Sequence, residues 1–254
     1  MKKFVIDLSK RAGNLLLKNF RKDYDLFRLR GTSKEIVTKY DKMSDEMIVK
    51  ALIKKFPEYN IITEESGLRN KNSEFTWIVD SLDGSSNFAA GNPFFSISIA
   101  LLHYDKPILG VAYAPFLKEL FVAEEGKGSL LNGKIIHVSD IEKLEKSYFV
   151  WCEGAGSNLQ MSKINSILHP IIKDLRKLGS GSLECAWVAS GRAEVYVTTQ
   201  IEPWDVAAGV ILVLEAGGKV TNFKGDDWKP VRTDFISSNT KVHNDIIEIM
   251  KNIE

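Results

Sequence analysis

Acidic side chains stand where hydrophobic runs of the sequence end. Asp80 and Asp83 follow the run TWIV in the stretch TWIVDSLDGSSNF, and Glu64 and Glu65 follow the run NIIT. Another acid, Asp205, lies near the start of the apolar stretch PWDVAAGVILVLE. Mg²⁺ prefers oxygen ligands, and phosphoryl-transfer sites with two metal ions need carboxylates from separate segments. The pattern indicates a metal site in which Asp80 and Asp83 bridge, while Glu64 and Asp205 each hold a flank.

Each of these acids also has an ordinary structural interpretation. Taken alone, Glu64 and Glu65 are a solvated pair, Asp205 is a helix N-terminal acid stabilised by the dipole, and an Asp-Gly pair is a turn. The order DxxDGSS directly behind a strand favours a functional site. Gly84 lets the backbone approach a ligand closely, and the N–H groups of 84–86 would bind an anion if a short helix begins there.

Two other acidic motifs fail on spacing. In an EF-hand calcium loop with its glycine at Gly84, the first ligand position would fall on Val79 and the twelfth on Ala90. Enzymes that form an aspartyl-phosphate use a second acid two residues after the nucleophile, and here that position is Leu82. A metal-activated water is therefore favoured over a covalent aspartate.

The elements that must position these side chains follow from the spacing of apolar residues. Spacings of three and four predict helices, and short apolar runs between turn residues predict strands. The first half combines helices with an antiparallel meander, and the second half alternates helices with strands, which indicates a layered α/β arrangement. Helices are expected at 2–21, 42–56, 158–168, 182–190, 203–216 and from about 240, and strands at 59–66, 76–80, 93–104, 107–115, 118–126, 147–152, 193–199, 219–223 and 234–238.

The composition restricts the class of protein. A chain of 254 residues that is 44% apolar can bury a core as one large domain or two lobes. We place the boundary in the polar segment DIEKLEK, which gives lobes at 1–145 and 146–254; the first would hold the main metal ligands and the second would supply Asp205 and substrate contacts. A formal charge of +1 argues against a nucleic-acid or membrane-surface protein. Two cysteines without CxxC spacing, and no run that resembles a signal peptide or membrane span, predict a soluble cytoplasmic protein.

Several segments together resemble the inositol monophosphatase family. These are IVTKYD, TEES, WIVDSLDGSSNF, GSGSLECAWVASGRAEVYV and PWDVAAG, which occur in the family's order over nearly the whole chain. The family belongs to the Mg²⁺-dependent, lithium-sensitive phosphatases. The resemblance implies an α/β fold, a layered α-β-α-β-α sandwich of the sugar-phosphatase type with two lobes. It also implies two to three Mg²⁺ ions and hydrolysis of inositol 1-phosphate and related sugar or polyol phosphates.

The resemblance assigns ligands to these ions. A first ion would be held by Glu64, Asp80 and the backbone carbonyl of Leu82. A second would be held by Asp80, Asp83 and Asp205, and Glu64 would also reach a weaker third ion.

The resemblance also assigns residues to the reaction. The Ser85 hydroxyl, oriented by Asp41, would position the attacking water, and Glu65 would assist from outside the ligand set. The amides of Gly84 and Ser85 would bind the phosphate. The remaining substrate contacts would be Ser180, Gly181, Thr198 and Asp205.

The chain departs from the family pattern at three positions. Ser81 stands where the family usually has proline, and Ser85 stands where it usually has threonine. Ser85 keeps the hydroxyl but loses the methyl that restricts the rotamer. Thr198 falls where animal inositol monophosphatases carry a glutamate that holds an inositol hydroxyl, so a broader substrate range is expected. The chain looks closer to archaeal-type enzymes, which resemble both inositol monophosphatases and fructose-1,6-bisphosphatases in activity.

Other functions remain open at this point. The main activity could be that of a fructose-1,6-bisphosphatase or a 3′-phosphoadenosine 5′-phosphate phosphatase. A non-catalytic regulator with the same fold is the alternative from another class, although all the expected ligands and the hydroxyl at Ser85 are present. The partners expected are a small phosphate monoester and a second copy in a homodimer, with no nucleic acid and no membrane.

Overall fold

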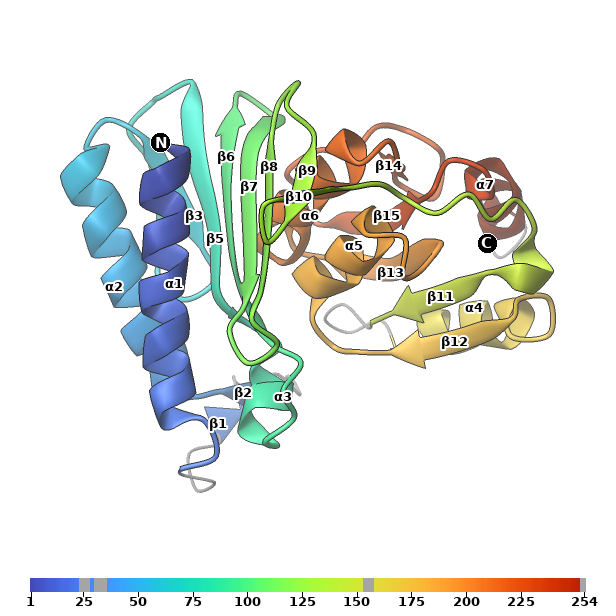
Figure 1. Ribbon diagram of the computed structural model, residues 1–254, viewed down its shortest axis with the longest axis horizontal. Coiled ribbons are helices and arrows are strands. Elements are labelled where there is room, and N and C mark those ends of the chain that lie inside the picture. The colour runs from blue at the N-terminus through green and yellow to red at the C-terminus, as the bar shows by residue number, and fades with distance from the viewer. Residues whose placement is uncertain (23–27, 30–35, 153–157, 252–254) are drawn as a thin grey trace.

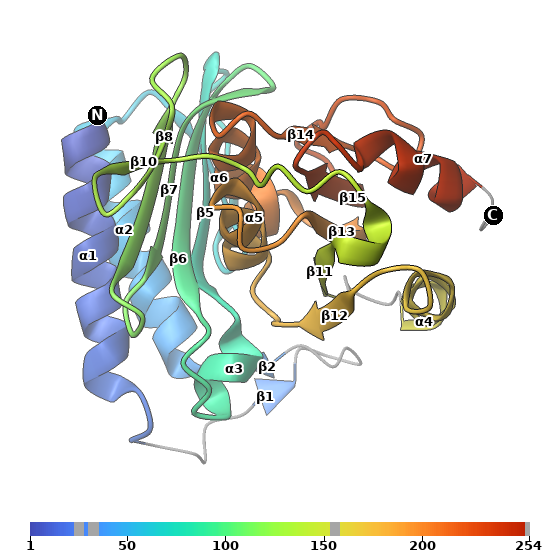
Figure 2. The same ribbon diagram turned by 45° about the vertical axis from the view of Figure 1, so that its right-hand side comes forward.

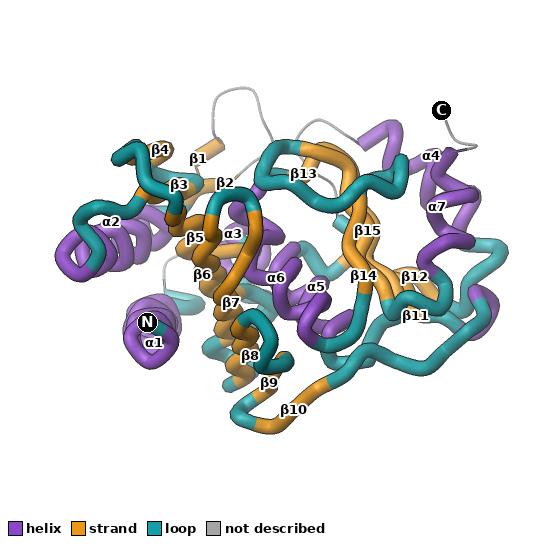
Figure 3. The backbone as a smooth tube through the Cα atoms, turned by 90° about the horizontal axis from the view of Figure 1, so that it is seen from above, coloured by secondary structure: helices purple, strands orange, loops and turns teal. Residues whose placement is uncertain are grey.

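The computed structural model describes residues 1–22, 28–29, 36–152 and 158–251. It is built in five layers: two helices, a large sheet, two helices, a small sheet and two helices (Figures 1 and 3). The layers confirm the expected α-β-α-β-α sandwich. In layer order, the helices are α1 (Lys2–Asn19) with α2 (Lys39–Lys55), then α5 (Gly181–Ala189) with α6 (Pro203–Glu215), then α4 (Asn158–Leu168) with α7 (His243–Lys251).

The outer helices α1 and α2 cover one face of the large sheet. In α1, the side chains of Val5, Leu8, Ala12 and Leu16 recur at three and four and are all buried against the sheet. Helix α2 begins at Lys39, three residues earlier than predicted, because Thr38 caps it through a capping box.

The large sheet has eight strands in the order β10-β9-β8-β7-β6-β5-β3-β4. The predicted antiparallel meander forms its centre, and β5 also pairs in parallel with β3. Strand β5 runs to Asp83, three residues beyond the predicted end. The strands are β3 (Asn60–Thr63), β4 (Gly67–Arg69), β5 (Phe75–Asp83), β6 (Ser96–His103), β7 (Lys106–Ala114), β8 (Glu119–Glu124), β9 (Ser129–Leu131) and β10 (Lys134–Ile136).

Three short elements lie at the end of the large sheet. Strands β1 (Arg28–Leu29) and β2 (Ile36–Val37) pair with each other, and β2 lies beside the short helix α3 (Ser85–Ala89) (Figure 2). Helix α3 therefore begins directly behind β5, which meets the condition set for anion binding by the N–H groups of 84–86.

The middle layer is buried on both sides, which explains why the sequence of α6 is almost entirely apolar. Helix α6 packs on the large sheet and on α5, and two glycines permit the close approach. A Cβ at Gly110 of β7 would lie 2.8 Å from the carbonyl oxygen of Ala208, and one at Gly209 would lie 2.6 Å from the sulfur of Cys185.

The small sheet has the order β12-β11-β13-β15-β14, with β11 parallel to β12 and β13. Its outer face packs on α4 and α7 through a separate apolar cluster that includes Phe149, Met161 and Ile246. Strand β12 was not predicted. The strands are β11 (Tyr148–Trp151), β12 (Asp174–Lys177), β13 (Val195–Ile201), β14 (Lys219–Thr221) and β15 (Thr233–Ser238).

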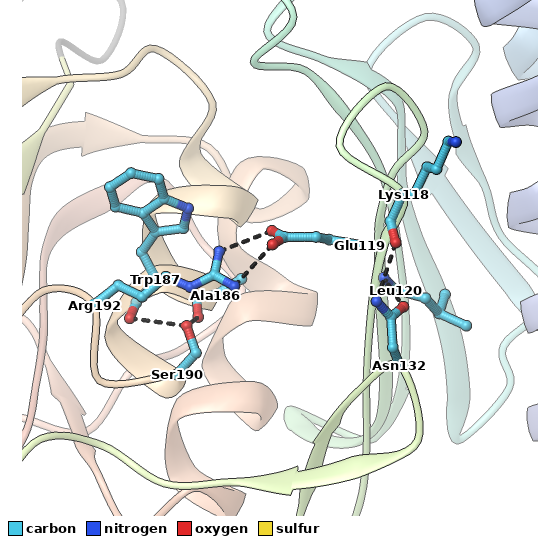
Figure 4. Close-up of polar contacts among 8 residues, drawn as sticks. All are labelled: Lys118, Glu119, Leu120, Asn132, Ala186, Trp187, Ser190 and Arg192. Carbon is cyan, nitrogen blue, oxygen red and sulfur yellow. Dashed lines mark hydrogen bonds and ion pairs between the residues drawn. The ribbon is translucent and has the colours of Figure 1, made fainter.

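The two sheets are joined by a continuous apolar cluster and by an ion pair. The cluster includes Phe121 of the large sheet and Tyr196 of the small sheet, with α5 and α6 between them. Arg192 follows α5 in the chain and donates two hydrogen bonds of 2.9 and 2.8 Å to Glu119 of β8 (Figure 4). The division into lobes at 1–145 and 146–254 stays a prediction. Apolar packing runs across this boundary. Within the described residues, no helix is both long enough and apolar enough to cross a membrane.

A buried histidine predicts how stability depends on pH. His243 is 0% exposed, and its two ring nitrogens lie 3.0 Å from the hydroxyl of Thr221 and 2.7 Å from that of Ser238. Burial lowers the pKa of His243 to about 4, and the charge of Lys219 contributes. The unfolded value is about 6.5, so the neutral ring contributes stability above that pH, and the contribution is lost as the pH falls toward 4, by at most about 3 kcal/mol.

The measurement is urea unfolding of the wild type and of His243→Gln between pH 7.5 and 4.5. The variant should be less stable at pH 7.5, and the difference between the two proteins should shrink as the pH falls. His169→Gln, at an exposed position, is the matched control and should follow the wild type. A constant difference between wild type and His243→Gln across this range would contradict the prediction.

Candidate active site

The predicted acidic residues meet at one edge of the large sheet. Strands β3 and β5 are parallel, and Thr63 pairs with Val79. The residues that follow this pair, Glu64 and Asp80, therefore lie side by side. Asp205 reaches the same region from the first turn of α6. Glu65 follows Glu64 and is half-buried.

A bulge in β5 brings Asp80 and Asp83 to the same face of the sheet. Asp80 pairs with Ser98 and Asp83 with Ser96, so three steps along β5 match two steps along β6. Residues three apart on a regular strand point to opposite faces, and the extra residue of the bulge restores them to one face. Both carboxylates are 3% exposed. The backbone N–H of Leu82 donates to Oδ1 of Asp80 at 3.0 Å, which fixes that side chain locally.

The carboxylates lie close enough together for their charges to interact. Burial is the first cause that raises the pKa of Asp80 well above its usual value, and the charges of Glu64, Asp83 and Asp205 raise it further. Burial also raises the pKa of Asp205 well above its usual value, followed by the charges of Glu64 and Asp83. Asp205 accepts a hydrogen bond of 3.2 Å from the backbone N–H of Glu202 at the start of α6.

Ser85 and Asp41 form a hydrogen-bonded pair beside this group. The Ser85 hydroxyl lies 2.5 Å from Oδ1 of Asp41 and 2.9 Å from the carbonyl oxygen of Leu82. Asp41 is fixed in turn, because its Oδ2 accepts from the N–H of Thr38 at 2.7 Å and from the Thr38 hydroxyl at 2.5 Å. Burial raises the pKa of Asp41, and these hydrogen bonds oppose the rise.

Ser81 connects α2 to the end of β5. Its hydroxyl donates to the backbone carbonyl of Asp41 at 3.0 Å, and the hydroxyl of Ser44 donates to the carbonyl of Ser81 at 2.8 Å. These reciprocal bonds hold the first turn of α2, and hence Asp41, against the strand. A proline at this position would have no hydroxyl to donate, so this contact follows from the serine of this chain.

Gly84 allows the end of β5 to lie close to the backbone at Phe94 and Gly179. It precedes α3 with φ +88°, and a Cβ there would lie 3.0 Å from the carbonyl of Phe94 and 3.1 Å from that of Gly179. The side-chain amide of Asn87, in α3, donates to the carbonyl oxygens of Leu178 at 2.7 Å and Gly179 at 3.2 Å. The segment 178–182 is thereby held next to β5.

The predicted contacts Ser180 and Gly181 lie in that segment and both bind Asp83. The Ser180 hydroxyl donates to Oδ2 of Asp83 at 2.6 Å, and the N–H of Gly181 donates to Oδ1 at 3.0 Å. Burial raises the pKa of Asp83, and the hydrogen bonds from Ser180 and Ser182 oppose the rise.

The hydroxyl of Thr198 contacts a buried cysteine. Thr198 is fully buried in β13, and its hydroxyl lies 3.6 Å from the sulfur of Cys152, which is itself 2.8 Å from the hydroxyl of Tyr196. The role of Thr198 as a substrate contact stays a prediction, and its side chain faces other protein groups.

Sequence reasoning missed several residues that support the site. The most prominent is Glu184 of α5, which is fully buried and accepts from the N–H groups of Leu178 at 3.0 Å and Gly179 at 3.1 Å. Burial raises the pKa of Glu184 to about 8. A glutamate inside the apolar run SLECAWVAS was the signal that could have found it, because such a residue is rarely buried without a role.

The carboxylates suit a hard divalent cation in chemistry, although they are not arranged as a finished ligand set. Among the described residues, no three acidic, histidine or cysteine side chains are grouped as metal ligands. Asp83 and Asp205 are turned instead to hydrogen-bond donors. The set nevertheless offers only oxygen atoms, comes from three segments, and is buried with mutual repulsion that a cation would relieve.

The fold is the α/β sandwich of the sugar-phosphatase type, and the comparisons with known proteins agree. The model of the inositol monophosphatase family matches residues 1–254. The chain belongs to the inositol monophosphatase family. Membership supports phosphatase activity on phosphate monoesters and dependence on a metal.

Relatives of this chain carry different names. A "fructose-1,6-bisphosphatase/inositol-1-monophosphatase" of Thermotoga maritima is 38% identical over 98% of this chain and 95% of its own length. A "Nus factor SuhB" of Xylella fastidiosa is 34% identical over 97% of this chain and 92% of its own. The solved structure of a Thermotoga maritima IMPase matches with a TM-score of 0.91 and 35% identity, over 99% of this chain and 96% of that one.

Proposed function

We propose that the protein is a Mg²⁺-dependent phosphatase that hydrolyses phosphate monoesters of inositol and of related sugars and polyols. The observation that supports this most is the position of the Ser85–Asp41 pair. The Ser85 hydroxyl lies 2.9 Å from the carbonyl of Leu82, which is between Asp80 and Asp83 in β5. A hydroxyl that can orient water therefore adjoins a buried group of carboxylates.

Ser85 has the right hydrogen-bonding state to orient a water molecule. Its single hydrogen is directed to the Asp41 carboxylate at 2.5 Å, which is the strongest acceptor within reach. The lone pairs of the Ser85 oxygen are then available to accept a hydrogen from the attacking water. Asp41 keeps this direction because Thr38 binds its other oxygen.

The remaining roles follow the family assignment. Glu64, Asp80, the Leu82 carbonyl, Asp83 and Asp205 would hold two to three Mg²⁺ ions. When bound, these ions would supply charge stabilisation for the phosphoryl group and the leaving alkoxide. The amides of Gly84 and Ser85 would bind the phosphate, and Glu65 would assist from beside Glu64. Ser180, Gly181, Thr198 and Asp205 would contact the alcohol part of the substrate.

The test is kcat/KM over a panel of phosphate esters. The panel contains inositol 1-phosphate, fructose 1,6-bisphosphate, glycerol phosphate and 3′-phosphoadenosine 5′-phosphate, each with Mg²⁺ and after chelation. We expect turnover of the first three with Mg²⁺ and none after chelation. If the adenosine compound alone is hydrolysed, the substrate class is wrong. If no ester is hydrolysed, the non-catalytic regulator becomes the better proposal, and the SuhB-named relatives make that outcome worth testing.

Substrate breadth is a separate prediction. Thr198 offers no carboxylate to a ring hydroxyl and is buried against Cys152. Sites built to hydrogen-bond one hydroxyl reject analogues by about 10⁴-fold or more, whereas weaker pairing discriminates far less. We expect kcat/KM for inositol 1-phosphate and fructose 1,6-bisphosphate to differ by less than about 10²-fold. A preference of about 10³-fold or more for the inositol ester would contradict this.

We also propose that the protein acts as a homodimer in the cytoplasm on small-molecule substrates. The family resemblance supports the dimer. The formal charge of +1 supports a partner other than nucleic acid. Sedimentation of the purified full-length chain tests the oligomeric state.

A further inference from the structure

The carboxylate of Asp83 is bound very unequally at its two oxygens. Oδ2 lies 2.6 Å from the hydroxyl of Ser180 and 3.0 Å from the N–H of Ser182, and it also accepts from the Ser182 hydroxyl. Among the described residues, Oδ1 accepts a hydrogen bond only from the N–H of Gly181, at 3.0 Å. These donors turn Oδ2 toward the protein, while Oδ1, with one donor and two lone pairs, keeps one lone pair.

Ser96 is hydrogen-bonded to Ser182. Its hydroxyl lies 2.7 Å from the hydroxyl of Ser182 and 3.1 Å from Oδ2 of Asp83. Two hydroxyl hydrogens cannot serve three contacts at once. Because Ser182 donates to the carboxylate at the shorter distance, the arrangement that satisfies both is a relay in which Ser96 donates to Ser182, and Ser182 donates to Asp83.

The donors are held in place by residues outside the cluster. Asn87 binds the carbonyls of Leu178 and Gly179, while Glu184 binds the N–H groups of the same two residues. Both Ser96 and Ser182 are fully buried, so water does not replace a missing hydroxyl easily. The donors at 180–182 therefore determine which oxygen of Asp83 remains available.

We propose that Ser182, with Ser96 behind it, is a positioning residue whose hydroxyl fixes the orientation of the Asp83 carboxylate, so that Oδ2 faces the protein donors and Oδ1 is available to a divalent cation. This proposal rests on the proposed function, because it takes Asp83 as a metal ligand. Residues that orient a ligand from behind change metal affinity by about 10- to 100-fold when removed. They do not contact the substrate, so their effect should be confined to the cation.

The test is Mg²⁺ titration calorimetry on the full-length, metal-stripped protein. The variants are Ser182→Ala and Ser96→Ala, and the matched control is Ser190→Ala. Ser190 is in the same part of the chain as α5, and its hydroxyl donates only to carbonyls of that helix, at Ala186 and Trp187. We expect the Kd for Mg²⁺ to rise about 10-fold or more in Ser182→Ala and less in Ser96→Ala, with no change in the control.

A second readout separates positioning from simple loss of folding. The Mg²⁺ concentration for half-maximal rate should rise in parallel with the Kd, while kcat at saturating Mg²⁺ stays within about threefold of wild type. The double variant should match Ser182→Ala, because Ser96 acts through Ser182. Ser96→Ala provides the test if Ser182→Ala does not fold.

The outcomes are distinguishable from failure of the proposed function. If Ser182→Ala and Ser96→Ala bind Mg²⁺ as tightly as Ser190→Ala, the positioning role is wrong even if the enzyme is active. If both variants bind Mg²⁺ more weakly and no protein hydrolyses any ester, the positioning role of Ser182 and Ser96 is supported and the phosphatase proposal fails. If the wild type binds no Mg²⁺, both are overturned.

Discussion

Asp80→Asn should lose about 10³-fold or more in kcat/KM with Mg²⁺ while remaining folded. Asp80 lies beside Glu64 and on the same face as Asp83, at the centre of the proposed ligand set. Asparagine keeps the acceptor oxygen for the N–H of Leu82 but removes the negative charge. Losing several kcal/mol of charge stabilisation corresponds to a loss of that size.

The same substitution should not weaken the metal-free protein. Burial and neighbouring carboxylates raise the pKa of Asp80, so its charge is unfavourable in the folded state without a cation. Unfolding in chelator at pH 7.5 should therefore give Asp80→Asn a free energy of unfolding equal to or above the wild-type value. Asp105→Asn, in an exposed turn, should change neither quantity. An Asp80→Asn enzyme with a tenth of the wild-type rate would exclude the central role.

Ser85→Ala should lower kcat by about 10²-fold and leave KM nearly unchanged. The hydroxyl is bound to Asp41 and is assigned to orienting water, so it contributes in the transition state more than in substrate binding. Ser85→Thr should be close to wild type, because it restores the hydroxyl. Steady-state kinetics at saturating Mg²⁺ measure both constants.

The neighbouring residue supplies the control for this prediction. Ser86 is exposed, so Ser86→Ala should leave kcat and KM unchanged. A Ser85→Ala enzyme with normal kcat would show that Asp41 orients the water without the hydroxyl. An increase in KM alone would instead place Ser85 in substrate binding.

Much of the fold could be predicted because local periodicity reflects burial. The helix expected at 158–168 has those bounds, and the apolar run from Pro203 forms α6 as expected. Strand β12 was missed because its four residues, DLRK, are mostly polar and lie at the sheet edge. The end of β5 was missed because DSLDG is typical of a turn, and a bulge has no sequence signature of its own.

The site was predictable in its acids and not in their surroundings. Asp80 and Asp83 could be found because carboxylates at a strand end are unusual. Their supports come from distant segments: the donors to Asp83 at Ser180 and Ser182 are 97 and 99 residues away. Thr198 was expected at the substrate; the structure shows its contact with Cys152, which no local pattern indicates.

These distances have a consequence for the order of events during synthesis. The large sheet is complete when Ile136 has been made, but its inner face is covered only by α5 and α6, which begin at Gly181 and Pro203. Chains are made N-terminal part first, at roughly 5–20 residues per second. For several seconds the nascent chain therefore carries an apolar sheet face, including Phe121, and an acidic strand end at Asp83 without its donors. We expect the chain to be most exposed to aggregation during that interval.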